Sequence, residues 1–183
     1  MTRLATYPTI DASPEAARPL LTAVEKQLGS APNLFRTVAS SPAALDAYLG
    51  FGAALAKGAL DLRTRERVAL AVADANGCGY CLAAHGYLAA NLAKLDAGEI
   101  AAARAGRSVD PKAAAALRFA TAVLRAKGRV SDADLAAARA GGLDDGAMVE
   151  VVAHVAINTF TNFVNEVART EIDFPAVPPR AAA

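Results

Sequence analysis

The chain has 183 residues, which is enough for one domain with its own hydrophobic core. Hydrophobic residues make up 54% of the sequence but aromatic residues only 5%, so alanine dominates the apolar set and favours closely packed helices over a β-sandwich. The formal net charge is +1 and the Lys and Arg residues are scattered, which gives no electrostatic case for binding nucleic acid or an anionic membrane.

The start of the chain lacks the apolar segment of a signal peptide, because three prolines and two acidic residues fall within the first twenty residues. No apolar run approaches the roughly 18 residues that cross a membrane. We therefore expect a cytoplasmic protein, in which a disulfide is usually transient and catalytic rather than structural.

Helix boundaries are marked by capping residues, prolines and glycines. Ser-Pro or Asp-Pro pairs begin three of the predicted helices, since a Ser or Asp N-cap followed by proline suits a first helical turn. Glycines follow the ends of most of them. The predicted helices are 14–28, 42–57, 62–76, 78–95, 111–127, 132–140 and a last one from 144 or 145 to 169.

The sequence predicts an all-α protein, because no segment shows sustained period-two alternation bounded by hairpin turns. We expect a single domain over residues 1–183, built as a bundle of helical hairpins. Its core should span about 13–170, and the proline-containing tail, 171–183, should be irregular.

A weak internal similarity raises the possibility of two related halves. ALAKG at 54–58 resembles LRAKG at 124–128, and ADANGCGYC aligns with HVAINTFTN in the last helix. In this alignment Cys78 falls opposite Thr159, and Cys81 falls opposite Asn162. Shared helix-forming composition explains the similarity almost equally well, so both explanations stay open.

The two cysteines of the chain form one Cys-x-x-Cys pair, Cys78 and Cys81, with His85 four residues on. Residues three or four apart share a helix face, so the thiols should be neighbours at roughly 5 Å between Cα atoms, a spacing that suits a disulfide. The His85 imidazole can then take a proton from Cys81. Gly77 just before the pair indicates a helix N-terminus, where the partial positive charge lowers the pKa of a thiol.

Glu66 lies twelve residues before Cys78, which is roughly 18 Å along one straight helix. If the chain folds back at Gly77, however, Glu66 and His85 come to heights that differ by about one helical turn. A carboxylate there could orient the imidazole and hold its proton. The predicted hairpin therefore gathers Glu66, Cys78, Cys81 and His85 into one site.

The spacing Glu-x11-Cys-x2-Cys-x3-His resembles that of the alkylhydroperoxidase D branch of the carboxymuconolactone decarboxylase superfamily. The segments APNLFRTVASSP and NTFTNFVNEVARTEIDFPAV are similar to those of peroxidase-related members of that group, so the resemblance covers nearly the whole chain. It implies an all-helical fold, no metal or organic cofactor, and assembly as a trimer or hexamer.

By position, the resemblance implies that Cys81 is the peroxidatic cysteine and Cys78 the resolving, more accessible one. It also implies that Glu66 and His85 form the proton relay. The well-studied peroxidase of the family has a histidine immediately before the second cysteine, whereas this chain has Tyr80. A phenol donates a hydrogen bond but is a poor base near neutral pH, so Tyr80 either forms a wall of the site or packs in the core.

Two simpler explanations compete for the cysteine pair. The thiols are either adjacent small apolar side chains, or ligands of a metal together with His85 and His154. A closed structural zinc site usually draws on two separated knuckles, and this chain has one Cys-x-x-Cys, so we predict no metal site.

A polar stripe interrupts the last predicted helix. It consists of His154, Asn158, Asn162, Asn165 and Glu166. Such a stripe usually marks an interface or a solvated face, and buried amides need partners. The alternative is that the stripe lines the active site, with His154, Asn158 and Asn162 in its wall, either within the subunit or across an oligomer contact.

Arginines at 63, 65 and 67 flank Glu66. We expect these side chains to be ordinary surface charges, with the anchoring of an acidic substrate or partner as the alternative.

Together these residues predict an antioxidant enzyme that reduces hydroperoxides, chiefly organic ones. The Cys81 thiolate would attack the O–O bond, and Cys78 would condense with the resulting sulfenic acid. An external dithiol, such as a lipoyl-bearing or thioredoxin-like protein, would restore the thiols. The alternatives are a decarboxylase or isomerase of a lactone acid, as in the other arm of the superfamily, and a non-catalytic redox sensor or interaction module.

We also expect a stable homo-oligomer. An Ala-rich chain with few aromatic residues and long apolar helices should leave apolar surface that a partner subunit covers.

Overall fold

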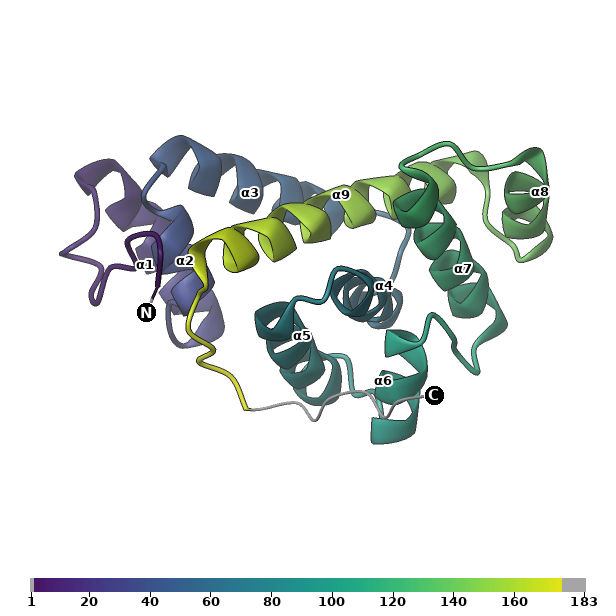
Figure 1. Cartoon of the computed structure of the whole chain (residues 1–183), viewed down its shortest axis with the longest axis horizontal. Helices are drawn as coiled ribbons and strands as arrows, with labels where there is room; N and C mark the ends of the chain where they lie inside the picture. The colour runs from purple at the N-terminus through teal and green to yellow at the C-terminus, as the bar shows by residue number, and fades with distance from the viewer. Residues whose placement is uncertain (1, 176–183) are drawn as a thin grey trace.

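The computed structural model describes residues 2–175, and every regular element within them is a helix, which confirms the predicted all-α class (Figure 1). The elements are a 3₁₀ helix η1 (Glu15–Ala17), α1 (Arg18–Leu28), α2 (Asn33–Val38), α3 (Pro42–Leu55), α4 (Leu62–Ala75), α5 (Gly79–Asn91), α6 (Ala97–Arg104), α7 (Pro111–Ala126), α8 (Asp132–Ala140) and α9 (Asp145–Ala168).

The α4–α5 hairpin lies at the centre of the fold. α4 packs against α5, α6, α7 and α9, while α9 crosses the molecule and also contacts α2, α3 and α5 (Figure 1). The larger hydrophobic core forms where α4, α7 and α9 meet, around Val72, Leu117 and Val151. A second core joins α1, α2 and α3 to the start of α5 and contains both cysteines. The thiol pair therefore lies inside the protomer.

Five of the predicted helix starts are confirmed by side-chain hydrogen bonds. In each case a Ser or Asp side chain accepts a backbone N–H of the first helical turn, which typically stabilises a helix by about 1 kcal/mol. These N-caps are Ser41, Asp61, Asp110, Ser131 and Asp144.

The first predicted helix starts too early and the cysteine helix ends too late. The Ser13 hydroxyl donates to the carbonyl oxygen of Ile10 instead of capping a helix, and the residues after it form the turn η1, so that α1 begins only at Arg18. α5 ends at Asn91 rather than near residue 95, because the chain leaves the helix before Lys94, which adopts a φ of 55°.

Two short helices, α2 and α6, were not predicted. A buried ion pair holds α6 against α4: Arg67 Nε donates to Glu99 Oε1 at 2.7 Å, and the two side chains are 3% and 4% exposed. Glu99 also accepts a hydrogen bond from the hydroxyl of Ser108. The expectation that Arg63, Arg65 and Arg67 are all surface charges is therefore wrong for Arg67, which is structural.

One carboxylate of α9 ties down the loop between α3 and α4. Glu150 accepts the backbone N–H groups of Ala59 at 2.9 Å and Leu60 at 3.1 Å. Gly58 lies so close that a Cβ atom there would sit 2.5 Å from a carboxylate oxygen of Glu150. Since this loop leads to the N-cap Asp61, the contact fixes where α4 begins.

The segment after α9 is irregular through Pro175, as predicted, but it is not loose. Asp173 Oδ2 accepts the backbone N–H of Asn33 at 2.7 Å, and Asn33 Nδ2 donates to the carbonyl oxygen of Glu171 at 3.1 Å. The segment is thereby fastened to the start of α2. The rest of the predicted tail, 176–183, lies outside the described residues.

By length and composition, α9 is long and apolar enough to cross a membrane, alone among the helices of residues 2–175. Its residues do not form one apolar run, because His154 and the asparagines of the polar stripe interrupt them. Half of its apolar window is buried inside the fold, as in a core helix.

The internal sequence alignment places the turn at Gly77 opposite a part of α9 that is continuous helix. The relation between two halves therefore stays a prediction.

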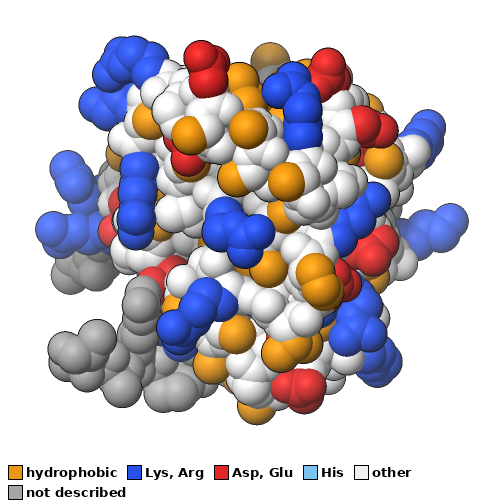
Figure 2. Space-filling model, turned by 90° about the vertical axis from the view of Figure 1, so that its right-hand side faces the viewer, with side chains coloured by type: hydrophobic (Ala, Val, Ile, Leu, Met, Phe, Trp, Pro, Cys, Tyr) orange, Lys and Arg blue, Asp and Glu red, His pale blue; other side chains and the backbone are white. Residues whose placement is uncertain are grey.

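Charges are mixed on the surface shown in Figure 2. Lys and Arg side chains stand apart from one another on this face, with acidic side chains between several of them. This matches the scattered charge pattern of the sequence.

Candidate active site

The turn that brings the site together is the one predicted at Gly77. Gly77 has a φ of 69°, in the left-handed region that glycine adopts without strain, and it allows the chain to reverse between α4 and α5. Cys78 is the N-cap of α5, and its Sγ accepts the backbone N–H of Cys81 at 3.4 Å. Both thiols therefore lie at a helix N-terminus, as the sequence predicted.

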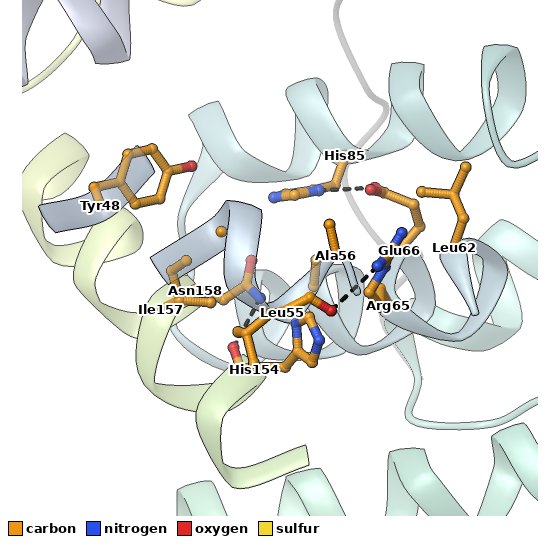
Figure 3. Close-up of a pocket in the computed structure, with 12 residues that line it drawn as sticks. Tyr48, Leu55, Ala56, Leu62, Arg65, Glu66, His85, His154, Ile157 and Asn158 are labelled. Carbon is orange, nitrogen blue, oxygen red and sulfur yellow. Dashed lines mark hydrogen bonds and ion pairs between the residues drawn. The ribbon is translucent and has the colours of Figure 1, made fainter. Parts of the chain in front are cut away.

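Glu66 and His85 meet across the hairpin. His85 Nδ1 lies 2.8 Å from Glu66 Oε2, a hydrogen bond that joins α4 to α5 (Figure 3). Burial lowers the pKa of His85, but the charge and hydrogen bond of Glu66 outweigh this and raise it above its ordinary value. A carboxylate so placed orients the imidazole and favours its protonated form.

Cys81 is the thiol whose surroundings favour the thiolate. A hydrogen bond from Cys78 lowers the pKa of Cys81 most, burial opposes it, and the charge of His85 and the amides of Asn165 and Asn162 lower it further, to about 6. At pH 7 a group with that pKa is roughly 90% ionised. Cys81 is thus the candidate nucleophile.

Cys78 has the opposite character. Its interaction with Cys81 and its burial raise its pKa, so Cys78 keeps its proton and donates to its neighbour. The structure contradicts the expectation that Cys78 is the more accessible thiol. Cys78 is 0% exposed and Cys81 is 2% exposed, because the second hydrophobic core encloses both. The two cysteines are free thiols in this structure.

The polar stripe of α9 faces the site within the same subunit, except for Glu166, which is exposed. Asn165 Nδ2 donates to Cys81 Sγ at 3.2 Å, and Asn162 Oδ1 accepts from Asn76 Nδ2 at 2.8 Å. The Nδ2 atom of Asn162 and the Oδ1 atom of Asn165 are buried with no hydrogen-bond partner of standard geometry among the described residues. Asn165, which the sequence singled out only as part of the stripe, is the member that contacts the thiol.

His154 and Asn158 line a cavity of about 200 Å³ on the α4 side of His85 (Figure 3). Glu66 and His85 form its opposite wall, while Arg65 donates to the carbonyl oxygen of Leu55 at its edge. Burial and the neighbouring Arg65 lower the pKa of His154, so this second imidazole is neutral near pH 7.

Tyr48 of α3 belongs to the site but was not predicted. Its hydroxyl points toward the ring of His85 from the side opposite Glu66 (Figure 3). Burial, Cys81 and Glu66 raise the pKa of Tyr48, so it stays protonated and can donate a hydrogen bond. No spacing signal links it to the thiols, because it lies thirty residues before Cys78 on another helix.

The Tyr80 hydroxyl is held by structural hydrogen bonds and does not take part in the Glu66–His85 pair. Its hydroxyl donates to Asp173 Oδ1 at 2.8 Å and accepts the backbone N–H of Leu34 at 3.1 Å. It therefore links α5 to α2 and to the C-terminal segment.

Within residues 2–175, no group of three or more His, Cys, Asp or Glu side chains is arranged to hold a metal ion.

We predict that the thiolate of Cys81 titrates with a midpoint near pH 6. Because its pKa is lowered, the thiolate is present above this pH and lost as the pH falls through it. The ultraviolet absorbance of the thiolate in the fully reduced protein measures this, with Cys81→Ser as the blank. Cys78→Ala removes the largest cause of the shift and should move the midpoint to higher pH. A wild-type midpoint near the ordinary thiol value of about 8.5 would contradict the assignment.

The fold and the site define an all-α protein with a buried dithiol beside a Glu/His pair. Residues 42–126 match the carboxymuconolactone decarboxylase family. The chain is also similar to an uncharacterized peroxidase-related protein of the alkylhydroperoxidase AhpD core from Ralstonia eutropha JMP134, with a TM-score of 0.83 and 26% identity over 94% of this chain and 92% of that one. The family match and the structural similarity both support the resemblance to the alkylhydroperoxidase D-like group of the carboxymuconolactone decarboxylase superfamily that the sequence indicated.

Two more distant structures share the fold. An uncharacterized peroxidase-related protein from Silicibacter sp. TM1040 gives a TM-score of 0.78 at 23% identity, over 93% of this chain and 94% of that one. The debrominase Bmp8, in complex with 2,3,4-tribromopyrrole, gives a TM-score of 0.78 at 21% identity, over 94% and 92% of the two chains. No curated protein matches the sequence significantly.

Proposed function

We propose that the protein is a cytoplasmic thiol peroxidase that reduces hydroperoxides with Cys81 and Cys78. The observation that carries the proposal is the pairing of two thiols of opposite character. Cys81 has a pKa of about 6, while Cys78 keeps its proton and lies at the other end of a Cys-x-x-Cys. A nucleophile needs a lowered pKa, and a resolving thiol must lie close enough to it to form a disulfide.

The reaction balances with the groups present. The Cys81 thiolate attacks the outer oxygen of ROOH, the O–O bond breaks, and the leaving alkoxide takes a proton from His85 to give ROH. The Cys78 thiol then attacks the sulfenic sulfur of Cys81, which forms the disulfide and releases water. An external dithiol, lipoyl-bearing or thioredoxin-like, is oxidised in turn as it reduces this disulfide.

Peroxide consumption by the purified full-length protein tests the proposal. Without reductant, tert-butyl hydroperoxide should oxidise the protein once per protomer, and dihydrolipoamide or reduced thioredoxin should then support continuous turnover. A single oxidation that none of these dithiols reverses would favour the redox-sensor alternative. No oxidation of the thiols at all would remove the peroxidase function.

Reductive debromination is a second candidate, favoured by the aromatic side chains of Tyr48 and Tyr80 beside the dithiol. The balanced reaction is Ar–Br plus two thiols giving Ar–H, HBr and the disulfide. Bromide release from 2,3,4-tribromopyrrole by the reduced protein tests it, with Cys81→Ser as control. The lactone-acid alternative gains no support from the site, because that chemistry does not need two thiols.

We further propose a homo-oligomer, a trimer or hexamer as the resemblance implied. Along the outer face of α9, apolar residues recur at intervals of three and four positions, which places them in one exposed stripe. They are Val149, Val152, Ala156, Phe160, Phe163 and Val167. An exposed apolar stripe of this length supports burial against a second copy.

Sedimentation at micromolar concentration should therefore detect an oligomer. Phe163→Glu, at a position 58% exposed in the protomer, should shift the protein toward monomer without unfolding it. Glu166→Gln on the same turn serves as a control for the change of charge. A wild-type protein that sediments only as monomer would contradict the proposal.

A further inference from the structure

The largest cavity described in the structure shares His85 and Tyr48 with the cavity in Figure 3 but is otherwise lined by different residues. It has a volume of about 480 Å³, against about 200 Å³ for the other. Residues from α1, α2, α3 and α5 line it, and the C-terminal segment closes one side with Asp173, Phe174 and Pro175. A cavity of several hundred Å³ is the usual size of a small-molecule site.

Aromatic side chains are concentrated in this cavity. The chain has six Phe and four Tyr, ten in all, and five of them line it: Phe35, Tyr48, Tyr80, Tyr87 and Phe174. The ring of Phe174 packs edge-on against Tyr80 at 5.8 Å between centroids and lies 6.0 Å from Tyr87. Rings set at such angles offer faces and edges to a planar ligand.

The described lining of the cavity contains no permanently charged cation. Among residues 2–175, no Lys or Arg lines it, and the one carboxylate in that lining, Asp173, already accepts from the Asn33 N–H and the Tyr80 hydroxyl. The His85 imidazolium at one end is already paired with the Glu66 carboxylate, so a ligand with a carboxylate or phosphate would be desolvated there without an unpaired cation to compensate it. The lining therefore selects against anions and favours a neutral, apolar ligand.

One end of the cavity reaches the proposed proton relay. His85 lines it and is hydrogen-bonded through Nδ1 to Glu66. Tyr48 lines the same end, and both Tyr48 and His85 interact electrostatically with the Cys81 thiol. The reactive end of a bound molecule would thus lie against an imidazole and a protonated phenol that both interact with the Cys81 thiol.

We propose that this cavity binds the organic group of a neutral aromatic hydroperoxide, with Phe174 as the residue that selects for an aromatic ring. The inference rests on the proposed peroxidase function and names its substrate class. Cumene hydroperoxide is the probe: with the two thiols it gives 2-phenyl-2-propanol, water and the disulfide. The C-terminal segment is then part of the substrate site, held in place by the hydrogen bonds that Asp173 accepts from Asn33 and Tyr80.

Kinetics give the first test. With a dithiol that supports turnover, Phe174→Ala should lower kcat/KM for cumene hydroperoxide about tenfold or more, while kcat/KM for hydrogen peroxide changes less than about threefold. Phe174→Leu keeps the apolar bulk without the ring, and its kcat/KM for cumene hydroperoxide should lie between the values for wild type and Phe174→Ala. Phe51→Ala, on an exposed ring outside the cavity, is the matched control.

Equilibrium binding separates this inference from the peroxidase function. Titration calorimetry of 2-phenyl-2-propanol into Cys81→Ser needs no turnover, and adding Phe174→Ala should weaken the binding about tenfold. Phe174-dependent binding in a protein that reduces no hydroperoxide would leave the cavity assignment standing and remove the peroxidase. Unchanged binding and an unchanged preference between the two peroxides in Phe174→Ala would overturn the cavity assignment while leaving the peroxidase in place.

Discussion

Cys81→Ser should reduce the rate of peroxide reduction by roughly 10³-fold or more, because it removes the nucleophile itself. Cys78 is not expected to take over this role, since its burial still raises its pKa when Cys81 is replaced. Cys78→Ser should instead leave the first step intact and stop the cycle after it. Cys81 would then persist as a sulfenic acid, with no thiol near enough to condense with it.

A sulfenic-acid probe with mass spectrometry distinguishes the two variants after limiting peroxide. We expect label on Cys81 in the Cys78→Ser variant and none on Cys78 in the Cys81→Ser variant. Fully reduced wild-type protein without peroxide is the control for background labelling. Equal labelling of the two variants would erase the assignment of roles, and label on Cys78 alone would reverse it.

Glu66→Gln and His85→Gln should each slow disulfide formation by roughly 10²-fold or more, the scale of positioned acid–base catalysis. The physical reason is the 2.8 Å contact between Glu66 Oε2 and His85 Nδ1, which holds the ring and raises its pKa. If His85 acts only when Glu66 orients it, the two defects overlap. The double variant should then be little slower than the slower single variant.

Stopped-flow rates at several pH values decide this, on variants shown by circular dichroism to remain folded. Glu25→Gln, an exposed carboxylate of α1, is the control for loss of charge. Multiplication of the two single defects in the double variant would mean independent roles. A Glu66→Gln variant with the wild-type rate would remove Glu66 from the site.

The parts of the site that lie close in sequence could be predicted from it. Helical spacing places Cys78, Cys81 and His85 on one face, and a glycine at position 77 is enough to bring Glu66 back to His85. These are local rules of helix geometry and turn chemistry. The same local rules located the caps of five helices, because an N-cap depends on three or four consecutive residues.

The remaining parts depend on contacts between distant segments. Asn165 reaches Cys81 from 84 positions away, and Asp173 reaches Tyr80 from 93 positions away. Nothing in the local sequence specifies which helix faces meet. The short helix α6 was missed although it has a local cap, since the Asp96 side chain accepts the backbone N–H of Glu99. The Arg67–Glu99 ion pair with α4 also helps to hold it in place. Helices of a few turns take most of their stability from such packing rather than from propensity.

The close approach of Glu150 to Gly58 means that substitutions at these two positions should depend on one another. Any side chain at 58 would place its Cβ against a carboxylate that two backbone N–H groups hold still, so that the acid must move and release them. Whether a substitution at either position is tolerated should therefore depend on the size of the side chain at the other. Relatives that carry a larger residue at 58 should carry a shorter side chain at 150 and another way to order the chain that leads to α4. The start of α4, the helix that carries Glu66, is thus constrained by two residues that lie outside the candidate active site.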